Sequence, residues 1–135
     1  MKYIAHKDGE REQTIKEHLI GTATLAGQFA EKFGSKDWGY CGGMLHDIGK
    51  YSEEFQKKIN EDTNNMVDHA TAGAQLCKKI NLPVLDYCIA GHHAGLPDYG
   101  NTAERSSLCG RYKKKIYNYE AYQEEIKICL LYTSP

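Results

Sequence analysis

The sequence lacks an apolar run near the roughly 20 residues that a membrane-crossing helix needs. Its start, Met1-Lys2-Tyr3, lacks the apolar segment of a secretion signal. A large charge excess is missing as well, because the formal net charge of the 135 residues is −1 and 41% of them are hydrophobic. These absences exclude membrane and disordered chains and predict one globular domain in the cytoplasm, with no membrane partner.

The cysteines lack the C-x-x-C spacing of zinc ribbons and redox motifs. They are odd in number and scattered along the chain, which argues against a disulfide framework. We expect them to be reduced and mostly buried as small hydrophobic side chains. The five residues are Cys41, Cys77, Cys88, Cys109 and Cys129.

Strand-like alternation of apolar and polar residues is missing too, whereas helical periodicity recurs. The predicted helices cover about residues 13–33, 36–47, 52–59, 68–80 and 83–91. In the first helix, the apolar stripe comprises Ile15, Leu19, Thr22, Leu25, Ala26, Phe29 and Phe33. Residues 1–12 are predicted to form a loose arm carrying His6 on the surface. The fold class is therefore predicted to be all-α, a helical bundle.

Glycines inside the second predicted helix indicate a close contact. Gly42 and Gly43 weaken a helix by about 1 kcal/mol each relative to alanine. Tolerance of that penalty suggests that another backbone approaches them. Gly49 is interpreted as the residue that ends this helix.

Histidines recur at intervals close to the length of one helix plus a connection. From His18 to His46 the interval is 28 residues, and two further intervals of 23 residues lead to His69 and to His92. A bundle can bring ligands from several helices to one interior point. The candidate metal ligands are His18, His46, Asp47, His69, His92 and His93.

The chemistry of these ligands favours a metal centre with a hydrolytic function. Imidazole and carboxylate bind Mn, Fe, Co, Ni or Zn well, and the absence of cysteine argues against a structural zinc site. Asp47 can bridge two ions, an arrangement suited to phosphoester hydrolysis. Lys50 is interpreted either as a partner for phosphate charge or as a residue capping a helix end. For His69 the alternative is a bystander beside Asp68, which would cap the helix.

A basic segment follows residue 100, where other signals fade. Arg111-Tyr112-Lys113-Lys114-Lys115 precedes Tyr117, Tyr119 and Tyr122. Positive charge mixed with aromatic rings can hold a single nucleic-acid strand. We interpret the segment instead as a solvated helix face with tyrosines folded under it, and keep strand binding as the alternative.

The motifs together resemble a known family. H-D-I-G-K-Y-S-x-x-F-Q spans residues 46–56, D-H-A spans 68–70 and is followed by Gly73-Ala74, and G-H-H-A-G-L-P-D spans 91–98. With His18, these motifs resemble the HD nuclease domain of the CRISPR-associated helicase-nuclease of type I systems, over about residues 13–100. The resemblance implies an all-α HD domain over residues 13–128 with a metal site in its interior.

The resemblance also implies a function and its partners. It implies a metal-dependent nuclease that cleaves single-stranded DNA, works with a superfamily 2 helicase domain or subunit, and is recruited by the Cascade surveillance complex. The cofactors would be two divalent transition metal ions (Mn, Fe, Co or Ni, or else Mg). The residues implied to hold one ion are His18, His46 and Asp47. Those implied to hold the other are Asp47, His69, His92 and His93. Asp47 and Lys50 are the predicted catalytic residues, and Lys50 and Ser52 the predicted substrate contacts.

The chain departs from this family after residue 98. Domains of the family continue further and supply another aspartate to the first ion, whereas residues 100–135 contain none. The run 129–135 resembles a translated sequencing adapter, so we expect a C-terminally incomplete domain with a non-native tail. The alternatives are an HD phosphohydrolase or cyclic-nucleotide phosphodiesterase, which shares the H-D-I-G-K signature, and a degenerate HD module that binds without turnover.

Overall fold

The computed structural model describes residues 2–61, 66–82, 84–93 and 95–127. Helices dominate it, so the predicted all-α class is confirmed, and one small hairpin is added. The elements, with η for short 3₁₀ helices, are β1 (Ile4–Asp8), β2 (Arg11–Thr14), α1 (Ile15–Glu31), α2 (Lys36–Leu45), η1 (Ile48–Tyr51), α3 (Glu53–Glu61), α4 (Thr71–Lys79), α5 (Leu85–Gly91), α6 (Leu108–Lys113) and η2 (Glu120–Glu124).

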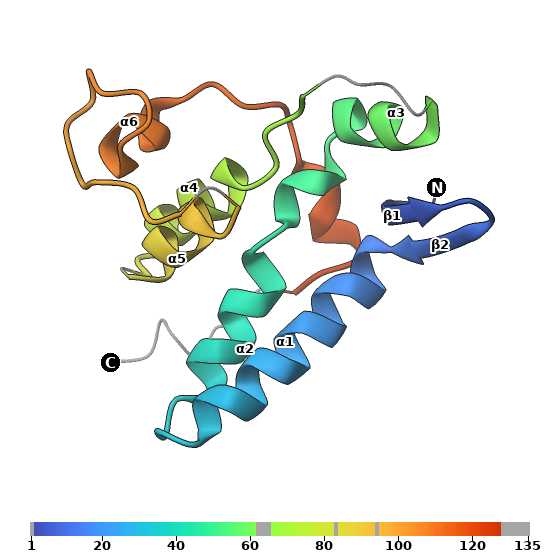
Figure 1. The fold of residues 1–135 in the computed structure, drawn as a ribbon, viewed down its shortest axis with the longest axis horizontal. Helices are drawn as coiled ribbons and strands as arrows, with labels where there is room; N and C mark the ends of the chain where they lie inside the picture. Colours follow the sequence, from blue (N-terminus) through green and yellow to red (C-terminus); the bar gives the residue numbers. More distant parts are fainter. Residues whose placement is uncertain (1, 62–65, 83, 94, 128–135) are drawn as a thin grey trace.

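The helices form groups around η1 (Figure 1). Helices α1 and α2 lie antiparallel, α4, α5 and α6 gather on one side, and α3 lies near the hairpin on the other. The short helix η1 contacts α1, α3, α4 and η2, so it lies at the centre of the fold. The largest fully buried side chains are Tyr51, Ile15, Leu19, Leu45, Ile48 and Leu108.

Small residues allow α1 and α2 to pack closely. A Cβ atom added to Gly39 would lie 2.5 Å from the carbonyl oxygen of Ala26, and one added to Gly43 would lie 2.4 Å from Cα of Ala23. The predicted close backbone approach is therefore confirmed at Gly43. At Gly42 the added atom would meet a side chain of α5 instead, at 2.9 Å.

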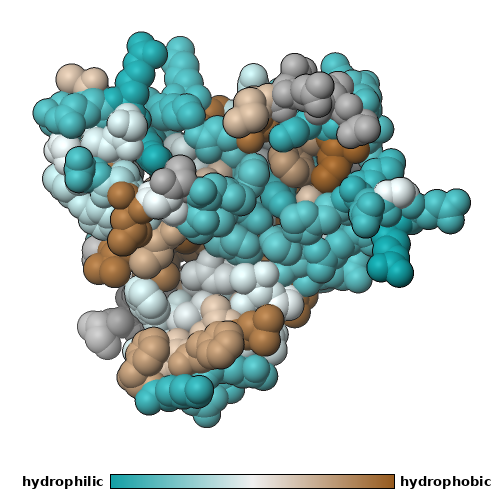
Figure 2. Space-filling model, viewed as in Figure 1, coloured by the Kyte–Doolittle hydropathy of each residue, from teal (hydrophilic) through white to brown (hydrophobic). Residues whose placement is uncertain are grey.

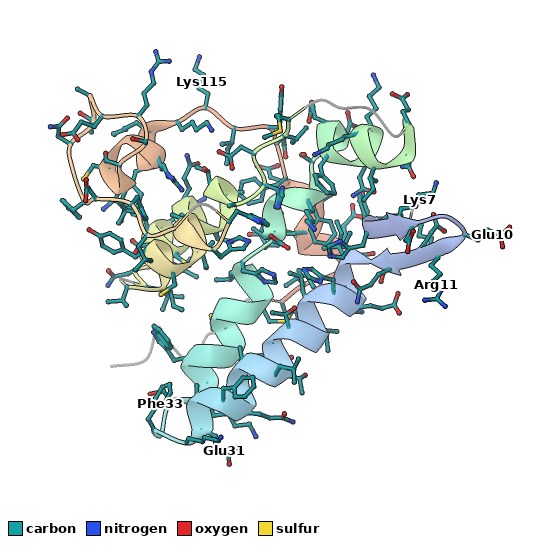
Figure 3. The ribbon with its side chains drawn as sticks, viewed as in Figure 1. Lys7, Glu10, Arg11, Glu31, Phe33 and Lys115 are labelled. Carbon is teal, nitrogen blue, oxygen red and sulfur yellow. The ribbon has the colours of Figure 1, made fainter. Side chains whose placement is uncertain are left out.

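The apolar stripe predicted for the first helix is wrong in its second half. Leu25, Phe29 and Phe33 are 56%, 65% and 70% exposed. Figure 3 shows Phe33 at the far end of α1, and Figure 2 shows hydrophobic surface at that end of the α1–α2 pair. The buried positions of this part of α1 are Ala23, Gly27 and Ala30. Close helix packing selects small side chains here, so hydrophobicity alone identified the wrong face.

The predicted loose arm is an ordered hairpin, which corrects both the arm and the expected absence of strands. β1 and β2 pair antiparallel, with Ile4 opposite Thr14 and Asp8 opposite Arg11, and Gly9 in the turn has φ 61°. Ile4 and Ala5 are buried, whereas the remaining residues of β1 are exposed. The strands escaped prediction because only one end of the hairpin is buried, which leaves no alternating pattern.

Helix boundaries differ most around the His46-Asp47 pair. α2 ends at Leu45, and the next residues lead into η1, which the sequence did not predict. Gly49 lies within η1 and does not end a helix. A Cβ atom at Gly49 would lie 2.4 Å from the carbonyl oxygen of His69, so a side chain here would force apart two segments that carry site residues.

The segment after residue 100 contains α6 and η2, neither of which was predicted. The Ser107 hydroxyl accepts a hydrogen bond from the backbone N–H of Gly110 and so caps α6. The rings of Tyr119 and Tyr122 stack at 5.7 Å, and Tyr122 is buried in the core cluster that contains Tyr51, whereas Leu108 of α6 belongs to a separate cluster. Tyr117, in contrast, is 53% exposed. That the tyrosines fold under the basic segment stays a prediction.

Two further expectations concern the whole chain. No disulfide joins the described cysteines, which are Cys41, Cys77, Cys88 and Cys109. Within the described ranges, no helix combines the length and the apolar character needed to cross a membrane. The predicted non-native tail, including Cys129, lies outside the described residues.

The Gln56 side chain fixes the hairpin to the helical body. Its oxygen accepts from the Ile4 N–H at 2.8 Å, and its nitrogen donates to the carbonyl oxygens of Ile4 and Lys50, both at 2.9 Å. Gln56 is buried. We predict that Gln56→Ala lowers the free energy of unfolding by about 3 kcal/mol, because it leaves buried backbone groups unsatisfied. Urea unfolding measures this, with the exposed helical Gln28→Ala as control. Equal stability of the two variants would contradict the prediction.

Candidate metal centre

The histidines singled out in the sequence come from separate elements and converge on one carboxylate. His18 lies on α1, and His46 and Asp47 lie between α2 and η1. His69 precedes α4, and the His92-His93 pair follows α5. The structure therefore brings all six predicted ligand residues together, and Asp47, with 3% of its surface exposed, is at the centre.

One oxygen of Asp47 faces α1 and the end of α2. Its Oδ2 atom lies 2.8 Å from Nε2 of His18 and 3.2 Å from Nε2 of His46. The ammonium group of Lys50 lies 3.5 Å from the same oxygen. This side of the carboxylate thus meets two ring nitrogens and one ammonium group.

The other oxygen of Asp47 faces the segments around α4 and α5. Its Oδ1 atom lies 3.0 Å from Nε2 of His92, 3.5 Å from that of His69 and 3.8 Å from that of His93. The Nε2 atoms of His69 and His93 are 2.7 Å apart. The six side chains therefore form two donor sets that share Asp47, and the donor atoms within each set lie within 4.8 Å of one another.

Backbone carbonyl groups orient two of these rings. Nδ1 of His46 lies 2.6 Å from the carbonyl oxygen of Gly43, and Nδ1 of His92 lies 2.6 Å from that of Ile89. Because a carbonyl oxygen only accepts, each Nδ1 carries the proton, and Nε2 is directed at Asp47. A neutral Nε2 and a carboxylate oxygen are both acceptors, so each of these contacts needs either a second proton on the imidazole or a metal ion between the two atoms. In a typical metal-binding histidine, Nε2 coordinates the metal ion while Nδ1 donates a hydrogen bond to another group of the protein. The donor set thus fits divalent transition metal ions.

The electrostatics keep Asp47 ionised. Burial disfavours its charged form, but hydrogen bonds from three surrounding imidazoles outweigh burial and hold the pKa of Asp47 well below its usual range. For His69, burial dominates and lowers the pKa to about 4. For His92, burial lowers the pKa, but the hydrogen bonds to Asp47 and to the Ile89 carbonyl, together with the Asp47 charge, outweigh burial and raise the pKa. The two imidazoles therefore differ in how readily they hold a proton beside the same carboxylate.

Lys50 is buried beneath this site. Its ammonium group donates to the carbonyl oxygen of Ala5 at 3.3 Å as well as approaching Asp47. Burial lowers the pKa of Lys50 despite the favourable Asp47 charge. With 5% of its side chain exposed, Lys50 is directed at the carboxylate and away from solvent. Lys50 lies in the last turn of η1, so the alternative interpretation of Lys50, a residue at a helix end, also describes its position.

Ser52 is buried, and its hydroxyl oxygen accepts from the backbone N–H of Phe55 at 3.1 Å, at the start of α3. Its predicted contact with substrate stays a prediction.

Asp68 accepts hydrogen bonds from the backbone N–H groups of Ala70 and Thr71. It therefore bonds backbone groups at the start of α4, but the N-cap residue of that helix is Ala70 and not Asp68, and His69 faces the site.

His6 was taken as a surface histidine, and sequence reasoning missed its position beside the site. It is exposed, but its ring packs edge-on against the ring of His18, with centroids 4.8 Å apart. The hairpin places it there, because Ile4 and Ala5 anchor β1 in the core. A short apolar pair directly before His6 was the only sequence signal.

Comparison with known proteins gives this geometry a family. The family model described as HD domain matches residues 15–130. One relative is the (1-hydroxy-2-(trimethylamino)ethyl)phosphonate dioxygenase (glycine-betaine-forming) of Leisingera caerulea, which is 29% identical over 102 residues. The match covers 70% of this chain and 50% of that protein, so the chain spans about half the length of its relative. HD domains are typically metal-dependent hydrolases that bind divalent ions. The matched span and the shared-aspartate cluster lead to one conclusion: the chain belongs to the HD domain family.

Proposed function

We propose that this chain is a metal-dependent phosphodiester hydrolase that cleaves single-stranded DNA in type I CRISPR interference. The observation that carries the hydrolase assignment is the pair of donor sets sharing Asp47, because two adjacent ions suit phosphoester hydrolysis. The resemblance in the motifs at residues 46–56 and 91–98 supports the narrower assignment. By the same resemblance, a superfamily 2 helicase and the Cascade complex are the proposed partners.

The residues have distinct proposed roles. One ion would be held by His18, His46 and Asp47. The other would be held by Asp47, His69, His92 and His93. Bound ions of this kind neutralise phosphate charge and lower the pKa of water. Lys50 would keep Asp47 ionised and oriented, because its ammonium contacts Oδ2 and is itself fixed by the Ala5 carbonyl.

The two donor sets differ in size, which predicts unequal metal affinity. The set containing His93 offers four ligands, and the set containing His18 offers three. We expect one Mn²⁺ per chain to bind tightly and a second to bind at least tenfold more weakly, as measured by titration calorimetry. His93→Ala should weaken the tight site, whereas His18→Ala should leave it nearly unchanged. Two ions bound with equal affinity would contradict this assignment.

Protons compete with the metal at His92, so affinity should depend on pH. The pKa of His92 is raised above its ordinary value, so as pH falls this ring takes up its second proton well before His69, whose pKa is about 4. Metal binding must displace the proton on His92. We predict that Mn²⁺ affinity falls as pH is lowered from 8 to 6, by about tenfold per pH unit once His92 is protonated. Affinity that stays constant down to pH 6 would argue against this assignment.

Cleavage assays test the proposed reaction. With Mn²⁺, Ni²⁺, Co²⁺ or Mg²⁺, the chain should cut circular single-stranded DNA, and Asp47→Asn should reduce the rate at least a hundredfold, because both donor sets lose their shared charge. The exposed Asp37→Asn is the matched control. Turnover of nucleotides or cyclic dinucleotides alone would favour an HD phosphohydrolase. Strand binding without cleavage under any of these metals would favour a binding module.

A second candidate comes from the relative, whose name describes a phosphonate dioxygenase. The 29% identity over 102 residues makes oxidation of a phosphonate worth testing on this chain. Incubation with Fe²⁺, oxygen and a hydroxylated alkylphosphonate separates the two candidates, since oxidation consumes oxygen and phosphodiester hydrolysis does not. Oxygen consumption dependent on the phosphonate would replace the hydrolase proposal.

A further inference from the structure

A cleft of about 1090 Å³ opens beside the metal centre, and His69 and His93 form part of its wall. The rest of the wall comes mainly from α6, the loop before it and the segment after it. Its positively charged residues are Lys58, Arg105, Arg111, Lys113, Lys114 and Lys115. Among the described residues that line it, Asp68 is the only acidic one. In a chain with a formal net charge of −1, six cations around one cleft are a strong local concentration of charge.

Some of these cationic side chains are paired with other groups of the protein, and others have charged groups that are free to bind a ligand. Lys114 pairs with Asp68, and the Arg111 side chain donates to the carbonyl oxygens of Ala90 and Ser106. In contrast, Arg105, Lys113 and Lys115 are exposed, and their charged groups have no hydrogen bond or ion pair within the described part of the chain. The paired cations fix the wall, while the unpaired ones can meet an anionic ligand.

A second cleft, of about 380 Å³, continues the first across α6. The two share Thr102 and Lys113, so they are contiguous. The second cleft adds Lys78, Lys79 and the aromatic side chains of Tyr99 and Tyr112. Tyr99 is 59% exposed. Figure 2 shows a mainly hydrophilic surface over this part of the molecule, and Figure 3 shows Lys115 projecting outward from it.

We propose that these two clefts form one binding track for single-stranded DNA, which leads the strand over α6 to the His69 and His93 side of the metal centre. Unpaired lysine and arginine side chains would contact successive phosphates, and Tyr99 would stack against a base at the far end. Cations combined with exposed aromatic rings are the features that hold single strands. The substrate named here rests on the proposed function, but the track can be tested by binding alone.

Single strands fit these features better than the alternatives do. A mononucleotide or cyclic dinucleotide has too few phosphates to reach from His93 to Lys78 and Lys79, beyond the shared Lys113. A duplex has its bases stacked on one another, so Tyr99 would have no base face to contact. The track therefore predicts a preference for an extended, unpaired strand.

Binding of fluorescently labelled oligothymidylate, measured by anisotropy in chelator, tests the track without cleavage. The test variant replaces Arg105, Lys113 and Lys115 with glutamine. The matched control replaces Lys7, Lys16 and Lys32, three exposed lysines outside both clefts, and so removes the same net charge. Figure 3 shows Lys7 on the hairpin, well away from Lys115.

We expect the test variant to bind at least tenfold more weakly at 100 mM salt, and the control within about twofold of the unchanged chain. The slope of log affinity against log salt should also become shallower by about 2, since each phosphate contact on a single strand contributes about 0.7. Equal affinities for the two triple variants, or failure of the unchanged chain to bind, would overturn the track. Circular dichroism confirms that each variant is folded.

Tyr99→Leu separates stacking from charge attraction. It should weaken oligothymidylate binding about tenfold and leave the salt slope unchanged. An equal loss of affinity for a duplex would overturn the assignment to a single strand.

Hydrolysis of bis(4-nitrophenyl) phosphate reports on the metal centre separately. A triple variant that binds poorly but still hydrolyses this small diester supports the track. The chain could instead bind DNA strands through the track and yet hydrolyse neither the small diester nor DNA. That result would refute the proposed function and leave the proposed track supported.

Discussion

A buried carboxylate surrounded by imidazoles is the constraint that the rest of this structure serves. Removing the charge of Asp47 from water is unfavourable unless positive charge or hydrogen-bond donors compensate it. The chain provides five ring nitrogens and one lysine around it, from elements far apart in sequence. Each neighbouring element must therefore be held in place, and much of the fold can be understood as the means of holding it.

Glycines and one glutamine hold these elements. Gly49 lets η1 touch the backbone of His69, and Gly73 would place a Cβ atom 2.3 Å from the carbonyl oxygen of Leu45, so α4 approaches the end of α2 equally closely. The Gln56 side chain bonds both β1 and the backbone carbonyl of Lys50. In the same strand, the carbonyl oxygen of Ala5 accepts a hydrogen bond from the Lys50 ammonium group. The hairpin and η1 thus stabilise each other around the lysine that contacts Asp47.

The sequence predicted the site better than the surfaces around it. Histidine spacing identified the residues that converge on Asp47, because a helical bundle can bring one or two ligands from each of several segments to one interior point, whatever the details of packing. The same approach failed on α1, where Ala23 and Gly27 face α2 while Phe29 is exposed. Close packing depends on the shape of the partner helix, which one sequence does not reveal. His6 was missed for a similar reason, since only the tertiary position of the hairpin brings it to His18.

The basic segment shows how a correct local interpretation can still be incomplete. Lys113, Lys114 and Lys115 are exposed, as a solvated basic face requires. However, Lys113 of this segment and Arg105 before it line the same cleft as His93, and no local pattern could predict that they share a cleft with the metal centre.

Access to the centre is asymmetric, and this bears on its chemistry. The His93 side chain is 54% exposed and lies in the wall of the basic cleft, whereas His18 is 17% exposed and lies behind His6. A substrate in the cleft would therefore meet the donor set on Oδ1 first, and the set on Oδ2 lies deeper.

The matched relative is named as a dioxygenase, while HD domains are typically hydrolases. The two names therefore do not by themselves fix the reaction of this chain, and the groups that line the approach decide which substrate can reach the donor atoms. Here six lysine and arginine side chains stand in that wall against one described acidic residue, Asp68, and this excess of positive charge favours a polyanion.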